Sequence, residues 1–167
     1  FCMSDYLRLL EEARSKVRNK AQLAGVTEST IKGFIVGEIV SAIEQDDWFL
    51  QNSLLELAYS IGNPELKADI LNNLLLSPGH EFHQEITREI QSLGHPSSVS
   101  CIEKILSDGF ALFEYTSSED GVIAKWFSHA LADIGTQEAI QVIEKFTQSP
   151  NIEISDEMKY RLRRIRA

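Results

Sequence analysis

Apolar residues recur every three or four positions over most of this chain, a period that predicts amphipathic α-helices. The periodic stretches are separated by short corners, and three of these resemble one another: Ile61-Gly62-Asn63-Pro64, Leu93-Gly94-His95-Pro96 and Ile134-Gly135-Thr136. In all three, an isoleucine follows the glycine by eight residues, at Ile70, Ile102 and Ile143. Repeated helix–corner–helix units predict a helical solenoid.

The same pattern, with its capping residues, predicts about nine helices. They are expected over about 4–24, 27–43, 48–61, 64–76, 80–93, 96–106, 118–134, 136–146 and 155–166. The expected helix caps have side chains that can accept bonds from free N–H groups at a helix start, and they are Ser4, Thr27, Asp46, Asp47, Asn63 and Ser155. We therefore expect an all-α, right-handed superhelix in one domain, 1–167. Its parts are an N-terminal pair (1–45), three repeats (46–79, 80–120, 121–150) and a C-terminal capping helix (151–167).

One insertion interrupts the regular spacing. The corner glycines lie 32 residues apart at Gly62 and Gly94, but 41 apart at Gly94 and Gly135. The extra residues fall within 107–121, where the aromatic residues Phe110, Phe113 and Tyr115 alternate with the acids Asp108, Glu114, Glu119 and Asp120. Aromatic side chains among acids suit a cationic partner. The alternative is that Phe110 and Phe113 fold back to cover the core, as apolar loop residues usually do.

The helical pattern also places several single side chains. Gly33 and Gly37, four apart in one helix, are expected to let a neighbouring helix approach closely, since glycine in a helix costs up to about 1 kcal/mol against alanine. Arg14 interrupts an apolar stripe and should extend its charge into water. His80 is expected to be exposed at a helix start, and Arg161 to lie on the outer face of the last helix.

The charge is strongly negative and unevenly distributed. The chain has 167 residues, 43% hydrophobic and 25% charged, with a net charge of -9. Residues 25–155 carry 20 Asp and Glu against six Lys and Arg, whereas both ends are mildly basic. An acidic body repels phosphate backbones and attracts cationic partners. The alternative is that the acidity only keeps the protein soluble.

No apolar run is long enough to predict a transmembrane segment, and no secretory signal is predicted. Two cysteines are too few for a disulfide framework, which fits the cytosol.

These corners resemble those of HEAT repeats, most clearly between Asp46 and Gln148. The resemblance rests on Leu93-Gly94-His95-Pro96 with Ile102 and Leu106, and on Ile134-Gly135 with Ile143 and Phe146. The arginine and aspartate usual near a HEAT corner are not consistently present; Asp133 and Lys104 come nearest. HEAT proteins mostly bind macromolecules along the second helix of each pair. By that resemblance, the binding face here would include Glu65, Asp69, Asn73, Glu103 and Glu144.

No catalytic motif stands out. His80-Glu81-Phe82-His83 lacks the spacing of a HExxH metal site, so we expect neither metal nor cofactor. HEAT-like DNA glycosylases need a cationic groove, and no residue here marks the chromophore of a bilin lyase. We therefore predict a monomeric, cytoplasmic, non-enzymatic protein that binds a basic protein, and neither nucleic acid nor membrane. Its most concrete form is an immunity protein that covers a basic toxin domain; a scaffold or adaptor and a bilin-lyase-like enzyme are the alternatives.

Overall fold

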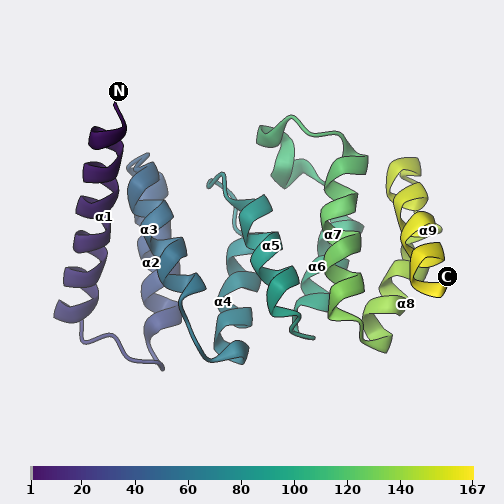
Figure 1. Ribbon diagram of the computed structural model, residues 1–167, viewed down its shortest axis with the longest axis horizontal. Coiled ribbons are helices and arrows are strands. Elements are labelled where there is room, and N and C mark those ends of the chain that lie inside the picture. The colour runs from purple at the N-terminus through teal and green to yellow at the C-terminus, as the bar shows by residue number, and fades with distance from the viewer. Residues whose placement is uncertain (1) are drawn as a thin grey trace. The chain divides into compact units, whose positions relative to one another are not determined.

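The computed structural model describes residues 2–167 and is helical throughout, without a strand in that span (Figure 1). It contains nine α-helices and one 3-10 helix, η1. Their bounds are α1 (Met3–Leu23), α2 (Ile31–Glu44), α3 (Trp48–Tyr59), α4 (Pro64–Leu76), α5 (His83–Leu93), α6 (Ser98–Asp108), η1 (Ala111–Thr116), α7 (Asp120–Ile134), α8 (Gln137–Phe146) and α9 (Ile152–Arg166). The predicted all-helical class is confirmed. The chain divides into two compact units, Phe1–Ile70 and Leu71–Ala167, with the boundary inside α4.

The first unit is built around α3, which packs against both α1 and α2. Its core includes Leu10, Ile35, Ile39 and Leu54, all buried. Arg14 does not simply extend into water as expected. It crosses from α1 to α3, where its Nε and Nη2 donate to the two carboxylate oxygens of Glu56, each at 2.8 Å. The arginine is half-exposed, so it is paired at the surface, not buried.

The second unit has two rows of helices. In one row α7 lies between α5 and α9, and in the other α6 packs against α8 (Figure 1). Contacts of α7 with α6 and α8, and of α8 with α9, join the rows. The corners behave as their glycines predict: α5 and α7 end at Gly94 and Gly135 with φ of 64° and 68°, a left-handed conformation that glycine adopts without strain. Ile102 and Ile143, which follow these corners, are fully buried.

Three of the helix pairs that pack side by side share one sequence spacing. A side-chain bond joins residues 42 apart in each: Arg14 to Glu56, Gln91 to Asp133, and Lys145 to Glu103. They link α1 with α3, α5 with α7, and α6 with α8. Bonds between other helices join residues at other separations, such as 33 for Arg161 of α9 and Ser128 of α7.

Helix starts were predicted only in part. Asp47 caps α3 as expected, by accepting from the N–H of Leu50, and Asn63 caps α4 by accepting from Glu65 and Leu66. Thr136, which was not among the expected caps, accepts from the N–H of Ala139 at the start of α8. The other expected caps are not caps: Ser4, Thr27, Asp46 and Ser155. Thr27 lies in a turn before α2, and the hydroxyl of buried Ser155 donates to the Thr147 carbonyl at 2.6 Å. Asn151 caps α9 instead, because it stands immediately before the first helical residue.

The close helix approach expected at Gly33 and Gly37 is wrong. A methyl group built on either glycine of α2 would meet no neighbouring atom within 4 Å. Both positions are exposed, as is Val40 on the same helix at 52%. These glycines therefore have no packing role among residues 2–167.

Candidate protein-binding surfaces

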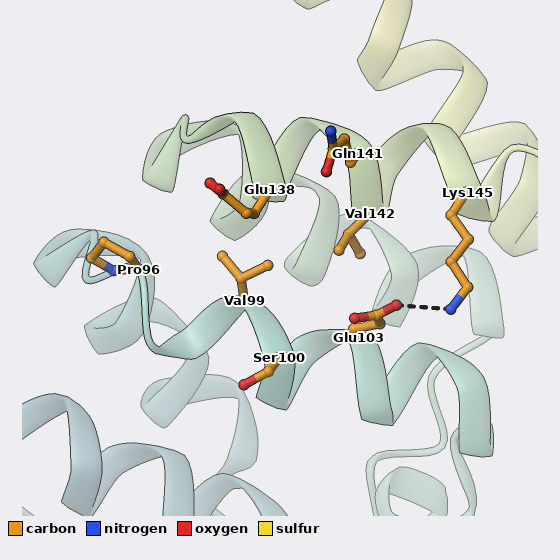
Figure 2. A pocket seen from close by; sticks show the side chains of 8 residues that line it. All are labelled: Pro96, Val99, Ser100, Glu103, Glu138, Gln141, Val142 and Lys145. Atoms are coloured by element: carbon orange, nitrogen blue, oxygen red, sulfur yellow. Dashed lines mark hydrogen bonds and ion pairs between the residues drawn. The ribbon is translucent and has the colours of Figure 1, made fainter.

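A shallow groove runs between α6 and α8, the two helices that the sequence suggested as a binding face. We call it the α6–α8 groove. It has a volume of about 460 Å³ and is lined by Pro96, Val99, Ser100, Glu103, Glu138, Gln141, Val142 and Lys145 (Figure 2). Figure 2 shows Val99 and Val142 between the two ribbons, with polar side chains on either side. An apolar floor with polar edges is the usual composition of a peptide-binding groove.

The charge of this groove is lower than the sequence suggested. Lys145 donates to Glu103 at 2.7 Å across the groove and neutralises it (Figure 2). Glu138, exposed at the start of α8, is the remaining carboxylate of the lining. The groove thus carries about one net negative charge.

Three of the other predicted acidic residues also have cationic partners. Asp108 pairs with Lys104 at 2.6 Å, Asp69 with Lys32 at 2.8 Å, and Glu144 with Arg166. Glu65 lies exposed at the start of α4 in the first unit, and Asn73 is half-buried on α4 in the second. Surface ion pairs of this kind leave the net charge unchanged but occupy the carboxylates locally.

The insertion covers the core with two of its three aromatic residues. Phe113 is fully buried and Phe110 is 8% exposed, and both rings lie beside Phe127 of α7, at 5.7 and 6.1 Å between centroids. Both rings are therefore part of the core and are not exposed on the surface. The insertion folds as η1 because these rings complete the apolar centre of the second unit, the alternative that the sequence left open.

Tyr115, the third aromatic residue, remains 40% exposed and is held by a buried histidine. Its hydroxyl donates to Nδ1 of His83 at 2.8 Å and accepts from the His83 backbone N–H at 3.1 Å. Nε2 of His83 donates to the Ser77 carbonyl at 2.8 Å, which fixes the neutral tautomer. Burial, with a smaller effect of neighbouring His80, lowers the pKa of His83 to about 4.

His80 is buried at 2% exposure, so its expected exposure is wrong. Its ring stacks on that of His83 at 4.0 Å between centroids. Nε2 donates to the Leu74 carbonyl at 2.8 Å, and Nδ1 accepts from the Phe82 N–H. Burial lowers the pKa of His80 as well. Both imidazoles are thus occupied by hydrogen bonds, and no cluster of three or more ligand-type side chains in residues 2–167 could hold a metal ion.

Three exposed glutamates lie near Tyr115 in space or in sequence, and sequence reasoning had not placed two of them in a site. Glu81 and Glu85, before and within the first turn of α5, lie close enough to add to the effect of burial in raising the pKa of Tyr115. Glu114 is its neighbour in η1. We name these four residues the Tyr115 rim. No sequence signal indicated this grouping, because Glu81 precedes α5 and the helical period therefore does not relate it to Glu85.

Glu119 and Asp120 have different positions at the start of α7. The Asp120 carboxylate accepts from the Asn151 amide at 2.7 Å and so joins the starts of α7 and α9. Glu119 is exposed in the preceding turn, where its backbone carbonyl accepts from Val122 and Ile123. Only Glu119 of the pair presents a free carboxylate in the described chain.

The remaining reactive side chain of interest is Cys101 of α6. It is buried, its thiol donates weakly to the Asn72 carbonyl, and burial raises its pKa to about 12. A thiol in this state is not a nucleophile near neutral pH. Among the described residues no helix is both long and apolar enough to cross a membrane.

Comparison of the chain with models of protein families, with curated proteins and with solved structures gives no significant match.

Proposed function

We propose that this chain is a non-enzymatic protein-binding module with the right-handed superhelical arrangement of HEAT-like repeats, and that its partner is a basic protein. The 42-residue spacing shared by three bonds between neighbouring helices supports the repeat arrangement. In its most concrete form the protein is an immunity-type inhibitor that covers a basic toxin domain.

The Tyr115 rim is the observation that carries the proposal. The Tyr115 hydroxyl is fixed by two bonds to buried His83, so the exposed ring loses little conformational freedom when it binds. Rigid, half-exposed tyrosines are frequent anchors of protein interfaces. The exposed carboxylates of Glu81, Glu85 and Glu114 would attract lysine and arginine, and the net charge of -9 would accelerate the encounter.

The α6–α8 groove favours a second candidate, a scaffold or adaptor that holds an extended segment. Val99 and Val142 offer apolar contact, and the Glu103–Lys145 pair leaves little net charge there. Such binding would depend less on salt than binding at the Tyr115 rim, because screening acts on charges.

Affinity capture with charge-reversed variants separates these candidates. The tagged protein would capture partners from a lysate of its source at low salt, followed by washing at rising salt and mass spectrometry. We expect one basic protein, released by salt and lost from Glu81→Lys/Glu114→Lys. The matched control is Glu12→Lys/Glu44→Lys, which changes the net charge as much as Glu81→Lys/Glu114→Lys does, but in the first unit. This control should still capture the partner.

The variant Val99→Asp/Val142→Asp tests the α6–α8 groove, because it replaces the two apolar side chains of the groove by charged ones. Loss of the partner with this variant alone would favour the adaptor. Retention of the basic partner by Glu81→Lys/Glu114→Lys would refute a role for the Tyr115 rim. A circular-dichroism spectrum and a melting curve for each variant would show that it remains folded.

A further inference from the structure

A second, chemically opposite groove lies between α5 and α7. We call it the α5–α7 groove. It has a volume of about 190 Å³ and is lined by Gln84, Thr87, Arg88, Gln91, Lys125, Trp126 and His129. It contains no carboxylate, although Asp and Glu outnumber Lys and Arg in this unit.

The two cations of the groove face it from neighbouring helices. Arg88 projects from α5 and Lys125 from α7, and both are exposed. In residues 2–167 neither has an ion-pair partner. The two carboxylates that act on His129 are already hydrogen-bonded: Asp133 accepts from Gln91 at 2.7 Å, and Glu157 accepts from Ser128 at 2.7 Å and from Arg161.

His129 adds a neutral donor. Buried Arg161 of α9 donates from Nη2 to Nε2 of His129 at 2.9 Å. Because a guanidinium cannot accept a hydrogen bond, Nε2 must be the acceptor, and Nδ1 therefore carries the proton. Burial and the nearby Arg161 charge lower the pKa of His129, which favours this neutral form. The predicted outward position of Arg161 is thus wrong: it is 9% exposed and lies behind the groove.

Trp126 forms an apolar wall. Its indole contacts the edge of buried Phe113, with 6.2 Å between ring centroids and 80° between planes, and is itself half-buried. One side of the indole is therefore fixed by the core. The same ring gives the groove a fluorescent reporter.

We propose that the α5–α7 groove binds a phosphate group. A phosphate monoester carries nearly two negative charges near neutral pH, which matches Arg88 and Lys125. Its oxygens accept the bidentate donors of arginine and the N–H of His129. The group could come from inorganic phosphate or from a phosphorylated side chain of a peptide. The strongly negative net charge disfavours a polynucleotide. This proposal does not depend on the proposed function, because the two use different residues.

Fluorescence titration of the full chain tests the proposal. Trp48→Phe leaves Trp126 as the sole tryptophan. Sodium phosphate, and separately a short phosphoserine peptide, would be added at constant ionic strength, with the unphosphorylated peptide as the blank. We expect a saturable change of Trp126 emission with phosphate, and at least a tenfold loss of affinity in Arg88→Gln/Lys125→Gln. Lys159→Gln/Arg163→Gln removes two exposed cations of α9 instead and should bind as before.

The two ligands distinguish the source of the group. Saturation by inorganic phosphate but not by the peptide would support a site for the free ion. Tighter binding of the phosphopeptide would support a site for a modified protein. No saturable change with either ligand, or equal affinity in the Arg88→Gln/Lys125→Gln variant, would overturn the proposal.

Discussion

Mild acid should destabilise the second unit through His83. Its neutral imidazole donates to Ser77 and accepts from Tyr115, so protonation at Nδ1 would break the bond that holds the insertion. The pKa falls from 6.5 to about 4 on folding. The unfolded chain therefore binds more protons between these values, and the free energy of unfolding falls as the pH is lowered through this window.

The magnitude follows from the two pKa values. For one group with these values, the free energy of unfolding decreases by about 2 kcal/mol between pH 7 and pH 5. His80 acts in the same direction, because its pKa is also lowered on folding. The carboxylate of Glu56, whose pKa is lowered chiefly by its bond to Arg14, contributes mainly below this window.

Urea denaturation at pH 7, 6 and 5, followed by circular dichroism, measures the effect. We compare the wild type with His83→Gln, whose amide can still donate to the Ser77 carbonyl and accept from the Tyr115 hydroxyl but does not titrate. This variant should lose much of the dependence on pH. His95→Gln at the α5–α6 corner is the control and should keep the full slope. An equal loss of stability in wild type and His83→Gln between pH 7 and 5 would refute the reasoning.

Two substitutions test the packing of the second unit by urea denaturation at pH 7. Phe113→Ala should reduce the free energy of unfolding by about 3–5 kcal/mol, because it leaves a cavity among the rings of Phe110 and Phe127; a loss below 1 kcal/mol would contradict its buried position. Arg161→Ala should cost about 2 kcal/mol, because it removes the donors to Ser128, His129 and Glu157. Arg163→Ala, at an exposed position of the same helix, should change the free energy of unfolding little. An equal loss in Arg161→Ala and Arg163→Ala would contradict the stabilising role of the Arg161 bonds.

The sequence predicted the helices well because their signals are local. Apolar spacing and the corner glycines depend on residues within one or two turns, and α5 and α7 end at Gly94 and Gly135 in the left-handed conformation that suits glycine. The isoleucines eight positions after the corners are buried. Asp47 and Asn63 cap their helices as expected for the same local reason.

The errors concern polar side chains whose partners the helical period does not place. The partner of His80 is only six residues away, but the Leu74 carbonyl meets its ring across the turn that follows α4, where no periodic pattern applies. Arg161 is buried because Ser128 and His129, more than thirty residues earlier, provide its partners. Nothing in the spacing around either residue indicates those partners.

The candidate site was predicted least well. The sequence indicated extra residues within 107–121, where the structure has η1, but not which of their aromatic residues would remain exposed. Phe113 is buried and Tyr115 is half-exposed, although both are aromatic and two positions apart. The exposed acids on the α6 and α8 helices were predicted as a free surface, whereas Lys145 and Arg166 pair with two of them.

The two kinds of helix packing have a consequence for folding kinetics. Bonds between α1 and α3, α5 and α7, and α6 and α8 span 42 residues, whereas α2 with α3, α7 with α8 and α8 with α9 pack as immediate neighbours in sequence. Contacts between immediate neighbours close short loops, so they lose less loop entropy than the longer spans and form earlier. We expect each unit to fold rapidly from a neighbouring pair of helices, so that the first-synthesised part of the chain can acquire structure before translation is complete.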